Sequence, residues 1–320
     1  MAVAVEGLCK EYEGGTVLRD IAFAVESGEI VSLVGPSGVG KTTLLRILAG
    51  LETADAGTVR YAVEPSLSHP VIMVFQDYLL FPNLSVYENV AFALRARRMG
   101  RRAVDERVRD MLDMFHLADK AAAYPVQLSA GQRQRVAIAR AMVVNPTLLL
   151  LDEPFANLDR NLKMETAEFI RHTQKTFGVT TVSVTHDLEE AFAMSDRIGI
   201  MLEGRLVQYA TPGEVYHAPA TREAARFLGP VNTLDAELCS LLGMEAPQNG
   251  EAVYVRPESL CLVHNPQGAA IVRGVTFGGH YIRYTLDVRG HVLTAYGVHN
   301  GITPGDRVDV RLASGFCCGV

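Results

Sequence analysis

Short apolar runs recur along the first two thirds of the chain, and segments with helical periodicity separate several of them. The run EIVSLVG (residues 29–35) is rich in β-branched residues and ends in glycine, which predicts a buried strand. KTTLLRILAGL (residues 41–51) follows with apolar residues at helical spacing. Further buried strands are predicted at residues 71–75, 147–151, 180–185 and 197–202. Strands that alternate with helices favour a mostly parallel central sheet.

Residues 77–145 carry mainly helical patterns. In residues 101–115 the apolar positions share one helical face. These positions are Val104, Val108, Met111, Leu112 and Phe115. The segment NLSVYENVAFALRARRM before them and the residues after LSAGQ also have helical character. We therefore expect residues 77–145 to form a helical subdomain inserted into the α/β fold.

The pattern changes to short alternating strands after about Gly229. In HYIRYTLDV, every second residue from Ile282 to Val288 is apolar, and RVDVRL repeats this alternation. Turn sequences such as VRGHV and TPGDR separate these strands. We expect a domain at residues 1–230 and a small all-β, barrel-like domain at residues 231–320.

Composition narrows the class of protein. The formal net charge of −6 gives no global basic field for nucleic acid or anionic lipid. The five cysteines form no C-x-x-C pair and are odd in number, so a reducing compartment is expected rather than a disulfide framework. We expect no signal peptide, because charge interrupts the first residues. No apolar run reaches the ~18 residues of a membrane span, so we expect a chain that does not cross a membrane by itself.

A glycine-rich loop joins the first predicted buried strand to the helix after it. GPSGVGKTT has the spacing G-x-x-x-x-G-K-[ST], set by Gly35, Gly40, Lys41 and Thr42. Glycine lets backbone N–H groups close around phosphate oxygens, and the helix N-terminus adds positive potential. Lys41 is expected to reach the β- and γ-phosphates of a nucleotide, and the Thr42 hydroxyl to ligate Mg²⁺. The predicted ATP-binding residues here are Gly35, Pro36, Ser37, Gly38, Val39, Gly40, Lys41, Thr42 and Thr43.

Polar side chains follow three other predicted strands. Asp152 and Glu153 close the run LLLL, where Asp152 is expected to hold Mg²⁺ and Glu153 to orient and deprotonate an attacking water. His186 follows TTVSVT and would face the γ-phosphate if that strand neighbours the Asp152 strand. Gln76 follows VIMVF, and its amide would touch Mg²⁺ or the water. We therefore expect Glu153, His186 and Gln76 to be catalytic, and the ring of Tyr12 to stack on adenine.

A second turn of small residues, LSAGQ, precedes a helical stretch far from the first loop. It contains Ser129, Ala130, Gly131 and Gln132. A serine hydroxyl and the N–H groups of a helix start form a second cradle for an anion. The chain therefore carries two phosphate-binding elements.

Together these elements resemble the ATP-binding cassette (ABC) ATPases. Tyr12, GPSGVGKTT, Gln76, LSAGQ, LLLLDEP, NLD (residues 157–159) and His186 occur in the family's order. The resemblance implies an α/β P-loop NTPase with a helical and an antiparallel β subdomain, ATPase activity, and ATP and Mg²⁺ as cofactors. It also implies a head-to-tail homodimer, in which the P-loop of one chain faces the Ser129 turn of the other and Asp159 forms the D-loop. Two positions depart from the family pattern. Ala130 replaces a glycine and Ala156 replaces a serine.

The second predicted domain contains VRPESL (residues 255–260) and is similar to an OB-like (TOBE) domain of solute-importer ATPases. That resemblance implies an ATPase on the cytoplasmic face of the plasma membrane, peripheral to separate transmembrane permease subunits. An extracytoplasmic solute-binding protein would be an indirect partner. The group serves polyamines, ferric iron, inorganic anions and sugars, and FGGHYIRYTLDV is slightly more similar to its polyamine and iron branches.

Two alternatives remain open from the sequence. One is the ATPase of an exporter, whose cassette would have the same motifs. The other is a soluble ABC ATPase acting on nucleic acid, but residues 232–320 hold six Arg and no Lys against eight Asp and Glu. This composition is not typical of a nucleic-acid groove, so we expect no nucleic-acid partner.

Overall fold

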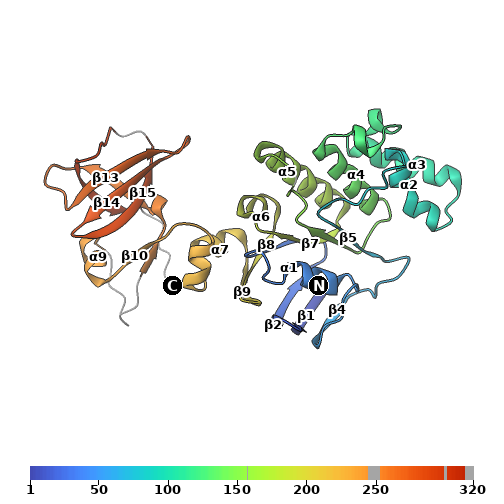
Figure 1. The fold of residues 1–320 in the computed structure, drawn as a ribbon, viewed down its shortest axis with the longest axis horizontal. Helices are drawn as coiled ribbons and strands as arrows, with labels where there is room; N and C mark the ends of the chain where they lie inside the picture. The colour runs from blue at the N-terminus through green and yellow to red at the C-terminus, as the bar shows by residue number, and fades with distance from the viewer. Residues whose placement is uncertain (157, 244–252, 299–300, 314–320) are drawn as a thin grey trace. The chain divides into compact units, whose positions relative to one another are not determined.

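The chain divides into two compact units in the computed structural model, Met1–Pro212 and Gly213–Val320. The structure describes residues 1–156, 158–243, 253–298 and 301–313, and only the backbone of residues 160 and 161. Cys317, Cys318 and Asn157 of the NLD motif lie outside the described residues. Each unit has its own arrangement of strands and helices (Figure 1).

A six-stranded sheet forms the centre of the first unit, in the order β5-β6-β7-β3-β8-β9. Its strands are β3 (Ile30–Val34), β5 (Val71–Val74), β6 (Leu148–Asp152), β7 (Thr180–Thr185), β8 (Arg197–Leu202) and β9 (Arg205–Ala210). The first five are parallel and β9 is antiparallel to β8. Every residue of β3, β6 and β7 is buried, as in a parallel sheet covered on both faces, although four of the six residues of β7 are Thr or Ser. The predicted mostly parallel sheet is confirmed.

A second, antiparallel sheet packs with helix α1 (Lys41–Leu48) against the central sheet. Its order is β2-β1-β4, with β1 at Val3–Tyr12, β2 at Gly15–Val25 and β4 at Ala56–Tyr61. Leu44 and Leu48 of α1 share one apolar core with Leu18 of β2 and Leu33 of β3. This arrangement confirms the expected antiparallel β subdomain.

Helices α2 (Val86–Ala96), α3 (Arg101–Met114) and α4 (Ala130–Met142) lie together on the side of the unit away from the blue β1–β2 sheet (Figure 1). They share an apolar core with residues of α5 (Arg160–Phe177) and α6 (Leu188–Met194). The face of α3 predicted to be apolar is buried. The five predicted apolar residues of this stretch all belong to that core.

An antiparallel five-stranded sheet dominates the second unit, in the order β12-β16-β13-β14-β15. The strands are β12 (Leu260–His264), β13 (Ala270–Phe277), β14 (Ile282–Val288), β15 (His291–Gly297) and β16 (Arg307–Leu312). The outer strands β12 and β15 approach each other, so the sheet curls toward a barrel. A short pair, β10 (Asn232–Leu234) with β11 (Val253–Val255), and helix α9 (Ala236–Leu241) complete the described part. This β fold agrees with the expected OB-like domain.

Two short helices precede this sheet, α7 (Pro212–His217) and α8 (Arg222–Phe227). Contacts group almost all of this segment with the second unit, whereas the sequence pattern suggested a boundary at residue 231. The Arg256 guanidinium contributes to this grouping: it is 2% exposed, donates to the carbonyl groups of Ala225, Gly229 and Pro230, and lies 4.5 Å from the ring centroid of Tyr216 in α7. The division after Pro212 therefore places α8 and all but the first residue of α7 in the second unit.

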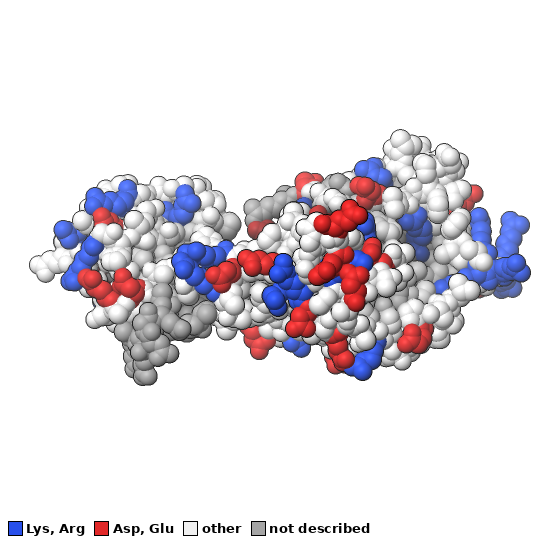
Figure 2. Space-filling model, turned by 60° about the horizontal axis from the view of Figure 1, so that its bottom comes forward, with Lys and Arg blue, Asp and Glu red and all other residues white. Residues whose placement is uncertain are grey.

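The surface carries both signs of charge. On the face shown in Figure 2, Lys and Arg side chains are intermixed with Asp and Glu, without a continuous basic band on the described residues. Within the described part of the chain, no helix combines the length and apolar character needed to cross a membrane.

Candidate functional site

The predicted phosphate-binding loop connects β3 to α1, and glycine is required at both of its ends. A Cβ on Gly35 would lie 2.3 Å from the carbonyl oxygen of Met201. Gly40 has a φ of 104°, and a Cβ there would lie 2.7 Å from a methyl group of Leu18. Between them, Ser37 is exposed. The close packing of both ends therefore shapes a loop whose tip is open to a ligand.

Lys41 places a positive charge inside this loop. Its side chain is buried, and Nζ donates to the carbonyl oxygens of Gly35 at 2.7 Å and Pro36 at 2.9 Å. Burial lowers the pKa of the ammonium, and the nearby carboxylates of Glu153 and Asp152 raise it by less. The loop thus combines backbone N–H groups with one fixed cation, which suits a phosphate chain.

A hydroxyl and a carboxylate meet beside Lys41. Thr42 Oγ1 donates to Asp152 Oδ1 at 2.9 Å, which joins the start of α1 to the end of β6. Burial raises the pKa of the Asp152 carboxyl, the neighbouring Glu153 raises it further, and the Thr42 hydrogen bond lowers it. A buried carboxylate next to a hydroxyl is an all-oxygen donor set of the kind that Mg²⁺ prefers. The residues present therefore fit a magnesium ion.

Glu153 and His186 lie together at the same edge of the sheet. Because β6 and β7 are parallel neighbours, with Asp152 opposite Val184, the residues after both strands emerge side by side. Glu153 has a φ of 44° and donates its N–H to the carbonyl of Val184 at 2.9 Å. Its carboxylate oxygen Oε1 lies 3.1 Å from His186 Nδ1. Gln76 follows β5, the next strand along, so it emerges at this edge too and is exposed.

A group of ionic side chains holds the segment that carries His186. Lys163 Nζ of α5 lies 3.1 Å from Asp187 Oδ2 and 3.0 Å from Glu190 Oε1. The Thr185 hydroxyl donates to the other oxygen of Glu190 at 2.7 Å. Burial raises the pKa of Glu190, and the hydrogen bonds from Thr185 and Lys163 lower it by less. These contacts fix the residues on both sides of His186. Sequence reasoning missed Lys163 because only the fold brings it here.

The predicted second cradle starts helix α4. Ser129 Oγ accepts the N–H of Gln132 at 3.3 Å, and Gln132 Oε1 accepts the N–H of Ser129 at 2.9 Å. This reciprocal pair is a capping box, which fixes the first turn of the helix. A Cβ on Gly131 would lie 3.2 Å from a methyl group of Leu162, so a small residue fits there. Ala130 between them is half-buried.

The remaining predicted residues lie at the ends of elements. Asp159 caps α5 by accepting the N–H of Leu162 at 3.0 Å. Tyr12 ends β1 with its ring 45% exposed and 5.2 Å from Lys10 Nζ. None of the hydrogen bonds made by the described residues joins the Ser129 turn to the phosphate loop. The two predicted phosphate-binding elements are therefore not joined by hydrogen bonds within the described part of one chain.

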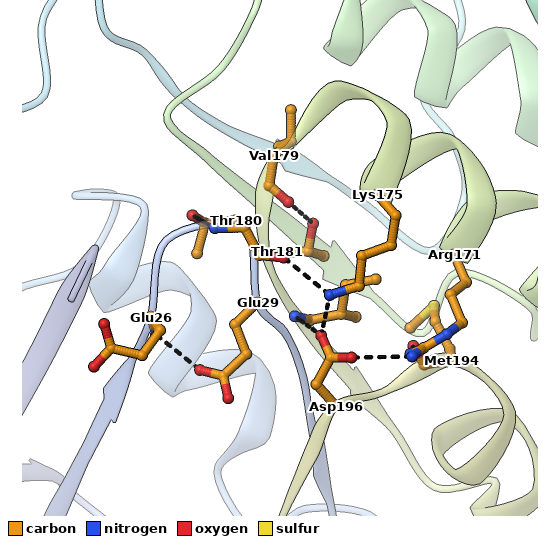
Figure 3. Close-up of polar contacts among 11 residues, drawn as sticks. Glu26, Glu29, Arg171, Lys175, Val179, Thr180, Thr181, Met194 and Asp196 are labelled. Atoms are coloured by element: carbon orange, nitrogen blue, oxygen red, sulfur yellow. Dashed lines mark hydrogen bonds and ion pairs between the residues drawn. The ribbon is translucent and has the colours of Figure 1, made fainter.

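The opposite edge of the sheet has a structural role. Asp196, just before β8, accepts hydrogen bonds from the Ile30 N–H at 2.9 Å and from Lys175 at 2.5 Å. Its other oxygen accepts from Arg171 at 3.0 Å. Figure 3 shows the Asp196 carboxylate between the two cationic side chains that extend from α5. These contacts tie the amino-terminal ends of the strands to α5, while the candidate site occupies the carboxyl-terminal ends.

Comparison with known proteins gives a consistent set of similarities. The family model described as ABC transporter matches residues 18–156. The spermidine/putrescine import ATP-binding protein PotA of Nitratidesulfovibrio vulgaris is 42% identical over 280 residues, which cover 86% of this chain and 70% of that protein. The sulfate/thiosulfate import ATP-binding protein CysA of Xylella fastidiosa is 42% identical over 292 residues, which cover 85% and 84%.

Two further matches extend this result. A second sulfate/thiosulfate import ATP-binding protein, CysA 2 of Chromobacterium violaceum, is 40% identical and covers 97% of this chain and 93% of its own. Among solved structures, cbiO1 of Clostridium perfringens, part of the ABC transporter complex cbiONQ, is 30% identical with a TM-score of 0.62. The similarity covers 67% of this chain and 90% of cbiO1.

Proposed function

Since the chain belongs to the ABC transporter family and is an ATP-hydrolysing subunit of an importer, we propose that two copies bind ATP head to tail and drive solute uptake through a separate permease. The observation that carries the proposal is the Glu153–His186 contact beside the Thr42–Asp152 pair, at the open end of the phosphate loop. This edge combines a cation for phosphate with carboxylates for Mg²⁺ and water.

Each residue has a separate task in the proposed reaction. Lys41 and the loop N–H groups hold the β- and γ-phosphates. Thr42, Asp152 and the Gln76 amide would hold Mg²⁺, which would supply charge neutralisation at those phosphates. Glu153 orients the attacking water and accepts its proton as a general base. His186, held against Glu153, bonds the γ-phosphate or that water, and Tyr12 stacks on adenine.

A substitution that preserves shape tests this assignment. Glu153→Gln should lower ATP turnover by about 10²–10⁴-fold, because the amide cannot accept the proton, while ATP affinity is retained. The matched control is Glu165→Gln, an exposed carboxylate on α5, which should keep normal turnover. Steady-state ATPase rates and nucleotide binding measure both. Normal hydrolysis by the Glu153 variant would rule out its role as base.

The absence, among the described residues, of hydrogen bonds between the two predicted phosphate-binding elements supports the proposed homodimer. Ser129 and the first turn of α4 would face the γ-phosphate held by the partner's phosphate loop, with Asp159 between the two sites. ATP binds across both halves and so favours the closed dimer, and hydrolysis removes that bridge. Light scattering of the Glu153→Gln variant should report a dimer with ATP and a monomer with ADP. A monomer in both would contradict the proposal.

An exposed apolar surface supports contact with permease subunits. Leu79 and Phe81 follow β5, and Phe92 of α2 lies with its ring centroid 4.5 Å from that of Phe81. All three side chains are exposed. Such a cluster is typical of an interaction site. Phe92→Ser should reduce recovery of a multi-span permease from detergent-solubilised native membranes, whereas Val292→Ser on β15 should not. Equal recovery would contradict docking at this surface.

The location follows from this assembly. We place the protein on the cytoplasmic face of the plasma membrane, bound through the permease, with an extracytoplasmic solute-binding protein as the indirect partner. We propose no nucleic-acid partner, because positive and negative side chains are intermixed on the face shown in Figure 2.

The solute is a small charged molecule in our proposal. One relative is named for spermidine and putrescine and others for sulfate and thiosulfate, at similar identity. A polyamine is the solute we favour, with ferric iron and inorganic anions as the next classes. Uptake of labelled putrescine and labelled sulfate should be compared in cells with the native chain and with Glu153→Gln. Loss of sulfate uptake alone would overturn the polyamine assignment.

A further inference from the structure

The segment after β5 turns through two left-handed residues. Tyr78 has a φ of 60° and Leu79 a φ of 42°, and neither is a glycine. Bulky residues rarely adopt this conformation, and they keep it only where their surroundings impose it. The segment is also the one that connects Gln76 to the helical subdomain. What imposes its shape is therefore relevant to the site.

Arg140 of α4 holds both carbonyl groups of this turn. Its guanidinium donates from Nη2 to Tyr78 O and from Nη1 to Leu79 O, each at 3.0 Å. It also lies 5.4 Å from the ring centroid of Phe81. Among the described residues, no carboxylate lies within ion-pair distance of Arg140. The fork of a guanidinium fits two neighbouring oxygens, and here it is directed at the backbone.

The Tyr78 side chain links the same turn to the proposed base. It is 4% exposed and belongs to the apolar core that contains Phe155. Its hydroxyl donates to the carbonyl oxygen of Pro154 at 3.3 Å. Pro154 directly follows Glu153, which is itself left-handed. Glu153 is thus held by its own N–H on one side and through the Pro154 carbonyl on the other.

We propose that Tyr78 and Arg140 are positioning residues for Glu153. Arg140 fixes the left-handed turn, the turn aims the Tyr78 hydroxyl at Pro154, and that hydrogen bond holds the carbonyl group of the residue directly after Glu153. The connection begins on α4, whose first turn is the Ser129 cradle, so it joins that helix to the base within one chain. The inference rests on the proposed role of Glu153 as general base.

The simpler explanation is that both side chains only stabilise the fold, and a matched pair of variants separates the two. Tyr78→Phe removes one hydroxyl. Tyr61→Phe removes a hydroxyl that donates to Leu48 O at 2.7 Å in the same unit, away from Glu153. A misplaced base lowers turnover without affecting nucleotide binding. Tyr78→Phe should therefore lower kcat by about tenfold, with KM for ATP within about twofold and a melting temperature equal to that of Tyr61→Phe.

Arg140 has its own control. Arg140→Lys keeps the charge but reaches only one of the two carbonyl groups. Arg97→Lys changes a guanidinium that donates to Val144 O at 3.2 Å, away from the turn. The first variant should lower kcat by about the same factor as Tyr78→Phe, and the second should keep normal kcat. If Arg140→Lys had the same kcat as Arg97→Lys, the proposed role of Arg140 would be overturned.

A double variant identifies Glu153 as the point of action. If Tyr78 acts through Glu153, adding Tyr78→Phe to Glu153→Gln should leave the residual rate unchanged within about twofold. A further tenfold loss would show that Tyr78 acts elsewhere and overturn the inference. Unchanged kcat for Tyr78→Phe alone would overturn it as well, while Glu153→Gln still reports on the base. Normal turnover by Glu153→Gln would refute the base and, with it, this inference.

Discussion

Asp196 gives a quantitative test of how the central sheet is held. Its carboxylate is the common acceptor for the Ile30 N–H, Arg171 and Lys175 (Figure 3). Asp196→Asn keeps one amide oxygen for the Ile30 N–H but removes the charge that both cations need. A hydrogen bond to a charged group stabilises a protein by about 1.5–3 kcal/mol. Both cations are partly exposed, at 36% and 42%, so screening reduces each ion pair to about 0.2–1 kcal/mol.

The expected loss of stability is therefore about 1–2 kcal/mol, mainly from the two ion pairs. In a unit of this size that corresponds to a fall in melting temperature of roughly 2–8 °C. Thermal unfolding followed by circular dichroism measures it, and the transition that Mg-ATP raises identifies the first unit. KM for ATP should stay normal, because Asp196 lies at the edge of the sheet opposite the candidate site.

The difference in stability between the native chain and Asp196→Asn should depend on pH with a definite sign. Burial raises the pKa of Asp196, but the hydrogen bonds from Lys175 and Ile30 and the charge of both cations lower it by more. The folded pKa therefore lies below the ordinary value. The stability that the carboxylate contributes is complete above about pH 4 and is lost as the pH falls through the folded pKa. The difference between native chain and variant should stay constant from about pH 8 to pH 5 and shrink below about pH 4.

Asp287→Asn is the control for this experiment. Its carboxylate pairs with exposed Arg273 in the second unit, so the ATP-responsive transition should not move. An unchanged melting temperature for Asp196→Asn at pH 7 would refute the reasoning. A difference in stability between the native chain and Asp196→Asn that changed between pH 8 and pH 5 would refute it as well.

Two further predictions concern the phosphate loop. Gly35→Ala should weaken binding of a fluorescent ATP analogue and lower the melting temperature, because the new Cβ meets Met201 O, whereas Gly100→Ala, with open space around it, should change neither. If Gly35→Ala bound the ATP analogue as tightly as Gly100→Ala does, the packing argument would be contradicted. Lys41→Ala should lower ATP affinity at least about tenfold, since a charge-assisted contact to phosphate is lost, and isothermal titration measures this. Affinity equal to the native chain would show that the loop amides suffice.

Much of the fold could be predicted because strand ends are informative. The runs before Gly35 and Asp152 are largely apolar, the run before His186 is rich in β-branched Val and Thr, and the parallel strands that they form end at one edge. Their polar successors therefore meet once the strand order is known. The roles of these residues stay predictions. Tyr78 and Arg140, by contrast, could not be found from the sequence, because their partners are backbone carbonyl groups that only the tertiary structure supplies.

The second unit shows the limit of local patterns in another way. Helices α7 and α8 follow the strands of the first unit without a change in local pattern, so no sequence signal separates them from that unit. Arg256, about thirty to forty residues further along the chain, contacts both helices through the Ala225 carbonyl and the Tyr216 ring. Alternation in β14 did predict its buried face, since Tyr284 and Leu286 are both buried. Sequence periodicity therefore predicts which face of a strand is buried. Long-range side-chain contacts determine which part of the chain packs against that face.

The capping box at the start of α4 has a consequence for assembly. With Ser129 and Gln132 already joined through hydroxyl, amide and backbone, the first helical turn has its final shape in a single chain. A segment that must fold on binding loses conformational entropy at that moment, and this turn has already lost it during folding. In the proposed head-to-tail dimer, the association of two copies would then resemble the docking of rigid surfaces. Its rate should depend on diffusion and orientation rather than on the ordering of a loop.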